Sequence, residues 1–233
     1  MATLVRESPR VKAQPSHLRL GGWLLLAAPL IFIGSVVWSL IMHENVTVTA
    51  DPATIADAVA AVAPHRLSWA GSWLLSCISI LAFIGGLIVL SRRLLPTSAR
   101  YLALVALICA AAAAVVWLFL VYLNIGLIAD PAQLPPFVAE QQVSTVGALI
   151  GRPFQRLAGA LWCLSAALAG LGLFTTRLLR RTGLIVGILN ALVFAAIAFG
   201  PGFPPIVALI LMIPLGIGLV RQREMVARPP VIA

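Results

Sequence analysis

Charged residues are scarce in this sequence, and acidic residues are the scarcest. Only 10% of the 233 residues are charged, and seven Asp or Glu stand against 16 Lys or Arg. Hydrophobic residues make up 61% of the chain, and the mean hydropathy is +1.06. These values are typical of proteins that bury most of their length in lipid. The composition excludes an ordinary soluble domain and predicts an all-α, polytopic membrane protein.

Cysteines and chemical motifs are equally few. All three cysteines fall inside apolar runs, where they behave as small hydrophobic residues rather than as disulfide partners. The sequence contains no Walker loop, GxGxxG, GxSxG or HExxH motif. Charged residues are also missing from the middle of the apolar runs, which disfavours an ion pump. We therefore expect no cofactor, and a non-catalytic protein is favoured over an enzyme.

Six apolar runs are long enough, or nearly so, to cross a bilayer as helices. The last two runs are short for a crossing, and Pro214 is expected to bend the sixth. Tyr101, Trp117 and Tyr122 are expected at the membrane interface. The predicted organisation is a cytoplasmic tail, 1–19, a transmembrane domain, 20–221, and a second tail, 222–233, with spans at 21–42, 68–90, 101–123, 157–175, 183–199 and 203–220.

Basic residues are distributed unevenly between the two ends of these helices. With a cytoplasmic N-terminus, thirteen lie in cytoplasmic segments, and only Arg66, Arg152 and Arg156 lie outside. Cytoplasmic loops of membrane proteins carry the excess of Lys and Arg. We therefore predict that both termini are cytoplasmic, in the inner (plasma) membrane of a bacterium. The same distribution is a topology signal, so membrane lipids rather than nucleic acid are the expected partners.

The first four predicted helices contain an internal repeat. A shift of 79 residues aligns Val36-Val37-Trp38 with Val115-Val116-Trp117, and Ala50-Asp51-Pro52-Ala53 with Ala129-Asp130-Pro131-Ala132. After an insertion, the matches continue with Arg66 on Arg156 and with Trp73 near the place of Trp162. A chain rich in Ala, Leu and Val can also match itself by chance, but Trp and Asp-Pro are uncommon here. The repeat predicts three hairpins, the first two being copies related by an axis along the membrane normal.

Arg66 and Arg156 are candidate binding residues, because they oppose the charge distribution and occupy matched places in the repeat. One interpretation is that each side chain extends separately to lipid phosphate. The other is an anion or lipid-headgroup site between the hairpins. A metal or haem site on His43 and His65 is the less favoured hypothesis, because interfacial histidines are more often solvated or hydrogen-bonded.

Helix-packing residues are predicted on the fifth span. Gly183, Gly187, Ala191 and Ala195 fall four residues apart and form a face that lets another backbone approach closely. Asn190 is a strongly polar residue deep in an apolar run, and its amide is expected to hydrogen-bond to a neighbouring helix. Such a face serves packing within the fold, a homo-oligomer or a protein partner.

Two segments resemble small bacterial six-helix membrane proteins that are grouped as domains of unknown function. They are HRLSWAG, at 65–71, and LLRRTGLIVG, at 178–187. The resemblance extends over most of residues 16–221. It implies the six-helix fold and brings no known activity.

Three functions follow from these observations, in decreasing order of preference. The first is a non-catalytic accessory or interaction protein that works through helix packing. The second is a protein that binds or transports a lipid or another hydrophobic molecule, with Arg66 and Arg156 at its anionic head. The third is a membrane enzyme or redox subunit that uses His43 and His65.

Reporter fusions test the predicted orientation. Green fluorescent protein joined after Ala233 should fluoresce, and alkaline phosphatase joined at the same place should be inactive, because both tails are predicted to be cytoplasmic. Phosphatase inserted between residues 46 and 65 should be active. The opposite pattern of activities would contradict the orientation.

Overall fold

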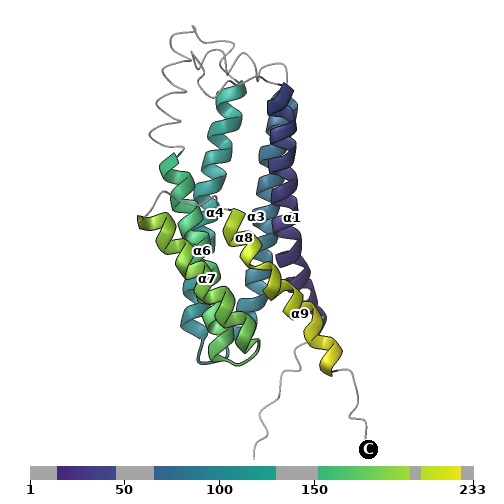
Figure 1. The fold of residues 1–233 in the computed structure, drawn as a ribbon, viewed down its shortest axis with the longest axis vertical. Helices are drawn as coiled ribbons and strands as arrows, with labels where there is room; N and C mark the ends of the chain where they lie inside the picture. Colours follow the sequence, from purple (N-terminus) through teal and green to yellow (C-terminus); the bar gives the residue numbers. More distant parts are fainter. Residues whose placement is uncertain (1–14, 46–65, 130–151, 200–205, 227–233) are drawn as a thin grey trace, which may run out of the picture.

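A computed structural model describes residues 15–45, 66–129, 152–199 and 206–226 (Figure 1). Within these ranges the regular structure is helical and contains no strand, as the composition predicts. Among the described residues, five helices are long and apolar enough to cross a membrane, and Ile206–Arg221 is a shorter apolar stretch. The helices are α1 (Pro15–Asn45), α3 (Arg66–Leu94), α4 (Arg100–Ala129), α6 (Arg152–Thr175), α7 (Arg180–Phe199), α8 (Ile206–Leu211) and α9 (Ile213–Val226).

Most helices are longer than the apolar runs from which they were predicted. Helix α1 begins at Pro15, inside the predicted N-terminal tail, and α9 continues to Val226, inside the predicted C-terminal tail. Hydropathy measures only the part of a helix that fits the lipid, whereas backbone hydrogen bonds continue into the polar flanks. Proline is also compatible with the first position of a helix, because its missing N–H would have no partner there.

The last apolar run is divided in two at Met212, close to the bend expected at Pro214. Proline has no N–H to donate to the carbonyl four residues earlier. Around the break the backbone makes tighter bonds, from Met212 N–H to the Leu209 carbonyl and from Leu215 N–H to the Met212 carbonyl, both at 3.1 Å. The run therefore continues as two helices, α8 and α9, with Met212 in a turn between them.

The first four long helices pack as two antiparallel pairs that lie side by side (Figure 1). Helix α1 packs along α3, α4 packs along α6, and α3 also contacts α4. The last helices were predicted to form a third hairpin, but they pack mainly on the first two pairs rather than on each other. Helix α7 packs mainly on α6 and α9 mainly on α1, with few contacts between α7 and α9. The final segment therefore joins the two pairs instead of adding a separate one.

Helices α6 and α7 touch through their backbones. A Cβ atom placed on Gly183 would lie 2.7 Å from the Gly170 carbonyl oxygen, and one on Gly170 would lie 2.7 Å from the Gly187 nitrogen. Real side chains cannot occupy such positions, so only glycine permits this crossing. In lipid, helices gain little from burying apolar surface against each other, and close van der Waals contact becomes a main source of association.

Helix α1 makes two crossings of the same kind, one on each of its neighbours. A Cβ on Gly86 of α3 would lie 3.2 Å from the Gly21 carbonyl oxygen. A Cβ on Gly22 would lie 2.9 Å from the Gly216 carbonyl oxygen of α9. The start of α1 and the first half of α9 therefore lie together, toward the lower end of the bundle in Figure 1.

Leucine substitutions distinguish these crossings from open glycine positions. Gly183→Leu should lower the free energy of unfolding by about 1–3 kcal/mol, because the new side chain would overlap the α6 backbone. Gly34→Leu is the matched control, since a Cβ at Gly34 meets nothing within 4 Å, and it should cause no loss because leucine favours helix more than glycine does. Thermal unfolding in detergent micelles measures both variants. Equal losses of unfolding free energy in the two variants would contradict the contact between Gly183 and the α6 backbone.

Candidate functional site

Four aromatic side chains from four helices meet inside the bundle. They are Phe32 of α1, Trp73 of α3, Trp117 of α4 and Trp162 of α6, hereafter the aromatic cluster. The Trp117 ring centroid lies 5.8 Å from that of Phe32, 6.0 Å from Trp73 and 5.1 Å from Trp162, with tilted planes. Tilted aromatic pairs at such distances contribute about 0.5–1.5 kcal/mol beyond the area they bury. Trp117 therefore connects the two helix pairs.

Trp117 was expected at the membrane interface, and this prediction is wrong. Its side chain is only 5% exposed, whereas Tyr101 and Tyr122 of the same helix are exposed. Small buried residues precede it on the inner face of α4, at the helical spacing of positions 103, 106, 110 and 113. Trp117 continues this stripe by one more turn. The spacing of these small residues in the sequence already indicates that position 117 shares their face of the helix.

A chain of hydrogen bonds holds Trp117 against α3. The indole Nε1–H of Trp117 donates to Ser76 Oγ at 3.0 Å, and the Ser76 hydroxyl donates to the Trp73 carbonyl at 2.6 Å. Tryptophan and serine recur with the same spacing in α6, as Trp162 and Ser165. The Ser165 hydroxyl donates across to the Ala106 carbonyl of α4 at 2.8 Å. Both serines thus use their hydroxyl groups to fix the position of α4.

Serine also joins α3 to α1. The Ser79 hydroxyl donates to the Ala28 carbonyl at 2.6 Å. This bond links the helices of the first pair, as the Ser165 bond links those of the second. Interhelical bonds of this kind contribute modestly in lipid, on the order of 0.6 kcal/mol each, but they fix the rotation of a helix about its axis.

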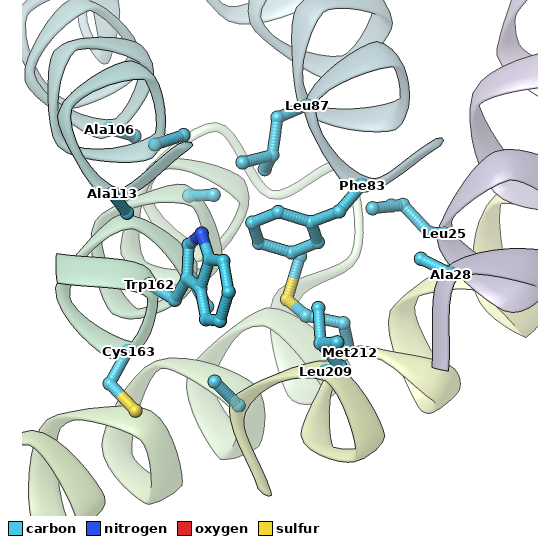
Figure 2. Close-up of a cluster of buried hydrophobic side chains, with 14 of the residues drawn as sticks. Leu25, Ala28, Phe83, Leu87, Ala106, Ala113, Trp162, Cys163, Leu209 and Met212 are labelled. Carbon is cyan, nitrogen blue, oxygen red and sulfur yellow. The ribbon is translucent and has the colours of Figure 1, made fainter. Parts of the chain in front are cut away.

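Two buried polar atoms have no hydrogen-bond partner among the described residues. They are Nε1 of Trp162 and Oδ1 of Asn190, and both side chains are 0% exposed. Figure 2 shows the Trp162 ring in the centre of the bundle, with the Phe83 side chain of α3 pointing toward it. A buried group without a partner costs about 1–3 kcal/mol. The indole could donate to a carbonyl or hydroxyl oxygen, and the amide oxygen could accept from a hydroxyl or N–H group.

Asn190 does not make the bond to a neighbouring helix that was predicted. Its Nδ2 donates to the Val186 carbonyl at 3.0 Å, one turn earlier in α7. The nearby backbone carbonyl competes successfully because it lies within reach without any tertiary arrangement. Within the predicted packing face, Gly183 and Gly187 are buried against α6, whereas Ala191 is exposed.

The remaining predicted site residues are placed only in part. Arg156 lies exposed near the start of α6. The side chains of His43, His65 and Arg66 lie outside the described residues, so the arginine pair and the histidine pair stay predictions. In the described part of the chain, no three His, Cys, Asp or Glu residues are grouped so that they could hold a metal ion.

Comparison with known proteins adds no precedent for this site. No family model, curated protein or solved structure matches the chain. The resemblance of the segments HRLSWAG and LLRRTGLIVG to small bacterial six-helix membrane proteins therefore stays a prediction. The chain's own residues must carry any functional proposal.

Phenylalanine substitutions test whether the two buried indoles differ as the hydrogen bonds indicate. Trp162→Phe removes an N–H group without a partner, whereas Trp117→Phe breaks the bond to Ser76. The two changes remove similar apolar area, so Trp117→Phe should cost about 1 kcal/mol more in unfolding free energy. Equilibrium unfolding in mixed micelles gives the comparison. A larger loss from Trp162→Phe would show that its indole N–H has a partner in the membrane.

Proposed function

We propose that this protein is a non-catalytic, multi-pass protein of a bacterial plasma membrane, and that it works by holding a membrane helix of a partner against α7. The partner is either another protein or a second copy of this chain. The excess of basic residues at one end of the predicted helices supports the plasma-membrane orientation. The outer surface of α7 is the observation that carries the proposal.

Helix α7 has two different faces. One face packs on α6 through Gly183 and Gly187. The other carries Ile188, Ala191, Leu192 and Ala195, all exposed, hereafter the outer patch. These positions fall within one stripe of the helix, because residues three and four apart share a face. Of the five long spans, α7 is also the least covered by the rest of the fold.

The outer patch is suited to a helix more than to lipid alone. Lipid chains require only an apolar surface, which the exposed Ile188 and Leu192 already offer. Ala191 and Ala195, four residues apart between these larger side chains, form a shallow site where a second helix can approach closely. Gly183 and Gly187 of the predicted small-residue face thus pack within the fold, whereas Ala191 and Ala195 of the same face are exposed on the outside.

The described interior is consistent with a holding role. The hydroxyl groups of Ser76, Ser79 and Ser165 all donate to backbone carbonyls. Their bonds join helices or tighten a helix turn. The polar side chains of the interior therefore serve mainly to position the helices, which supports a protein that acts through its shape and surface.

A second candidate function is supported by the unpaired atoms of Trp162 and Asn190. A hydrophobic molecule that carries a hydroxyl group could accept a hydrogen bond from the Trp162 indole N–H or donate one to the Asn190 amide oxygen. Such a molecule would add a discrete mass in native mass spectrometry, and the added mass should disappear in Trp162→Phe. Retention of the added mass in that variant would exclude this site.

Native mass spectrometry of protein extracted gently from its own membrane tests the primary proposal. The spectrum should show a second copy or a bound protein partner. In the double variant Ala191→Leu with Ala195→Leu, the complex should weaken about tenfold or more, because larger side chains prevent close approach.

The control for this test lies on α4. Ala111 and Ala112 are also exposed alanines, so Ala111→Leu with Ala112→Leu adds the same volume to a different helix. This variant should leave the complex unchanged. A bare monomer from native membranes, or equal weakening by both double variants, would overturn the role of α7.

A further inference from the structure

Two arginine-rich turns lie next to each other at the lower end of the bundle in Figure 1. One joins α3 to α4 through residues 95–99, and the other joins α6 to α7 through residues 176–179. A Cβ on Gly172 of α6 would lie 3.0 Å from Leu94 Cδ1 and 3.6 Å from Ala99 Cβ, so the end of α6 packs on the first turn. The arginine turns, as we call them, carry Arg92, Arg93, Arg100, Arg177, Arg180 and Arg181.

Charge in the arginine turns is of one sign. Neither segment, 91–101 or 174–183, contains an Asp or Glu residue. Five of the six arginines are exposed, and Arg93 is half-buried. Lys12 is the only lysine of the whole chain, and the cations of the arginine turns are all guanidinium groups. A guanidinium presents a planar fork of N–H donors that pairs with two oxygens of a phosphate, which an ammonium group cannot do.

Hydrogen bonds hold both turns in fixed shapes. The Thr97 hydroxyl donates to the Leu94 carbonyl and accepts the Ala99 N–H at 3.1 Å. In the second turn, the hydroxyls of Thr175 and Thr176 donate to the Gly172 carbonyl at 3.0 and 2.9 Å. The backbones that carry the arginines are therefore already ordered, and a ligand would not have to order them on binding.

Individual arginines are also oriented. The Arg100 guanidinium lies 4.6 Å from the Tyr101 ring centroid, with Nη2 donating to the Tyr101 hydroxyl at 2.7 Å. The Arg180 guanidinium lies 5.5 Å from the Phe174 ring centroid. Stacking on a ring restrains a long side chain and leaves the edge of the guanidinium plane available to an anion. Arg177 has a φ of 59°, a backbone conformation that favours glycine, yet an arginine occupies it.

Apolar side chains adjoin this charge. Leu95 and Tyr101 are exposed beside the first turn. The turns end helices that are apolar enough to cross a membrane, so in a bilayer spanned by these helices the arginines are expected at the level of the lipid headgroups. Soluble phosphate would use the guanidinium groups alone, whereas a phospholipid would use both the guanidinium groups and the apolar neighbours.

We propose that the arginine turns bind anionic phospholipids of the adjacent leaflet, with the lipid phosphate on the guanidinium groups and the glycerol and first acyl carbons against Leu95 and Tyr101. This site is separate from the outer patch of α7 and does not depend on the proposed partner. Binding anchors both turns to the membrane surface and gives the protein a preference for membranes rich in anionic lipid.

Lipid retention in nanodiscs tests the site. The full chain is reconstituted in an equal mixture of phosphatidylcholine and phosphatidylglycerol, and the bound lipids are counted by native mass spectrometry. Wild-type protein should retain phosphatidylglycerol preferentially. Arg177→Gln with Arg180→Gln should lower that preference about 25-fold, or about fivefold for each arginine removed. Inorganic phosphate at the same concentration should not displace the lipid.

Two control variants make the test specific. Arg6→Gln with Arg10→Gln removes the same charge from the N-terminal segment and should change the preference less than about twofold, because it leaves the turns intact. Arg177→Lys with Arg180→Lys keeps the charge but removes the planar fork, so it should recover only part of the preference that the glutamine pair loses. Equal loss in the N-terminal control would indicate diffuse attraction, and full retention of the preference in the lysine pair would indicate attraction to charge alone, without the guanidinium fork. Displacement by inorganic phosphate would indicate a soluble-anion site. Each of these three results would overturn the proposal.

Discussion

Close contact between glycine backbones is the constraint on which the arrangement of helices depends. Lipid removes most of the hydrophobic gain that drives helices together in water, so association relies on dense packing and on a few polar bonds. The three glycine crossings, of α1 with α3, α1 with α9, and α6 with α7, all lie within about two helical turns of the arginines at one end of the bundle. The helices are thus held together most tightly next to the arginine turns, which gives those turns a fixed support.

The aromatic cluster holds the same helices at a second level, farther from the arginine end. Trp117 is at its centre and bonds to Ser76, while Trp38, its counterpart in the predicted repeat, is 45% exposed. The difference follows from position in the bundle. Helix α4 lies between α3 and α6, whereas α1 has α3 and α9 as neighbours, so matched residues face different surroundings. A repeated sequence can therefore fold into similar helix pairs and still use its tryptophans differently.

A bundle held at two levels leaves exposed the two surfaces on which the proposed partners would bind. The outer patch of α7 is apolar and lies within the span, whereas the arginine turns are basic and lie at its end. These surfaces suit different molecules, a membrane helix in one case and a lipid phosphate in the other. The unpaired atoms of Trp162 and Asn190 are the one indication in the described interior of a further ligand, because a buried polar group without a partner costs stability unless something satisfies it.

Local properties of the sequence determined the class of protein, the positions of the long helices and the break near Pro214, because hydropathy and the missing proline N–H act over a few residues. The glycines at 183 and 187 could likewise be recognised as contact points from their spacing. Only the tertiary structure decided that α7 and α9 pack on different helices. It also decided that Trp117 faces the interior and that Asn190 forms its hydrogen bond within its own helix. These outcomes depend on which faces of distant helices fit together, and that complementarity is a property of pairs of surfaces rather than of any single stretch of chain.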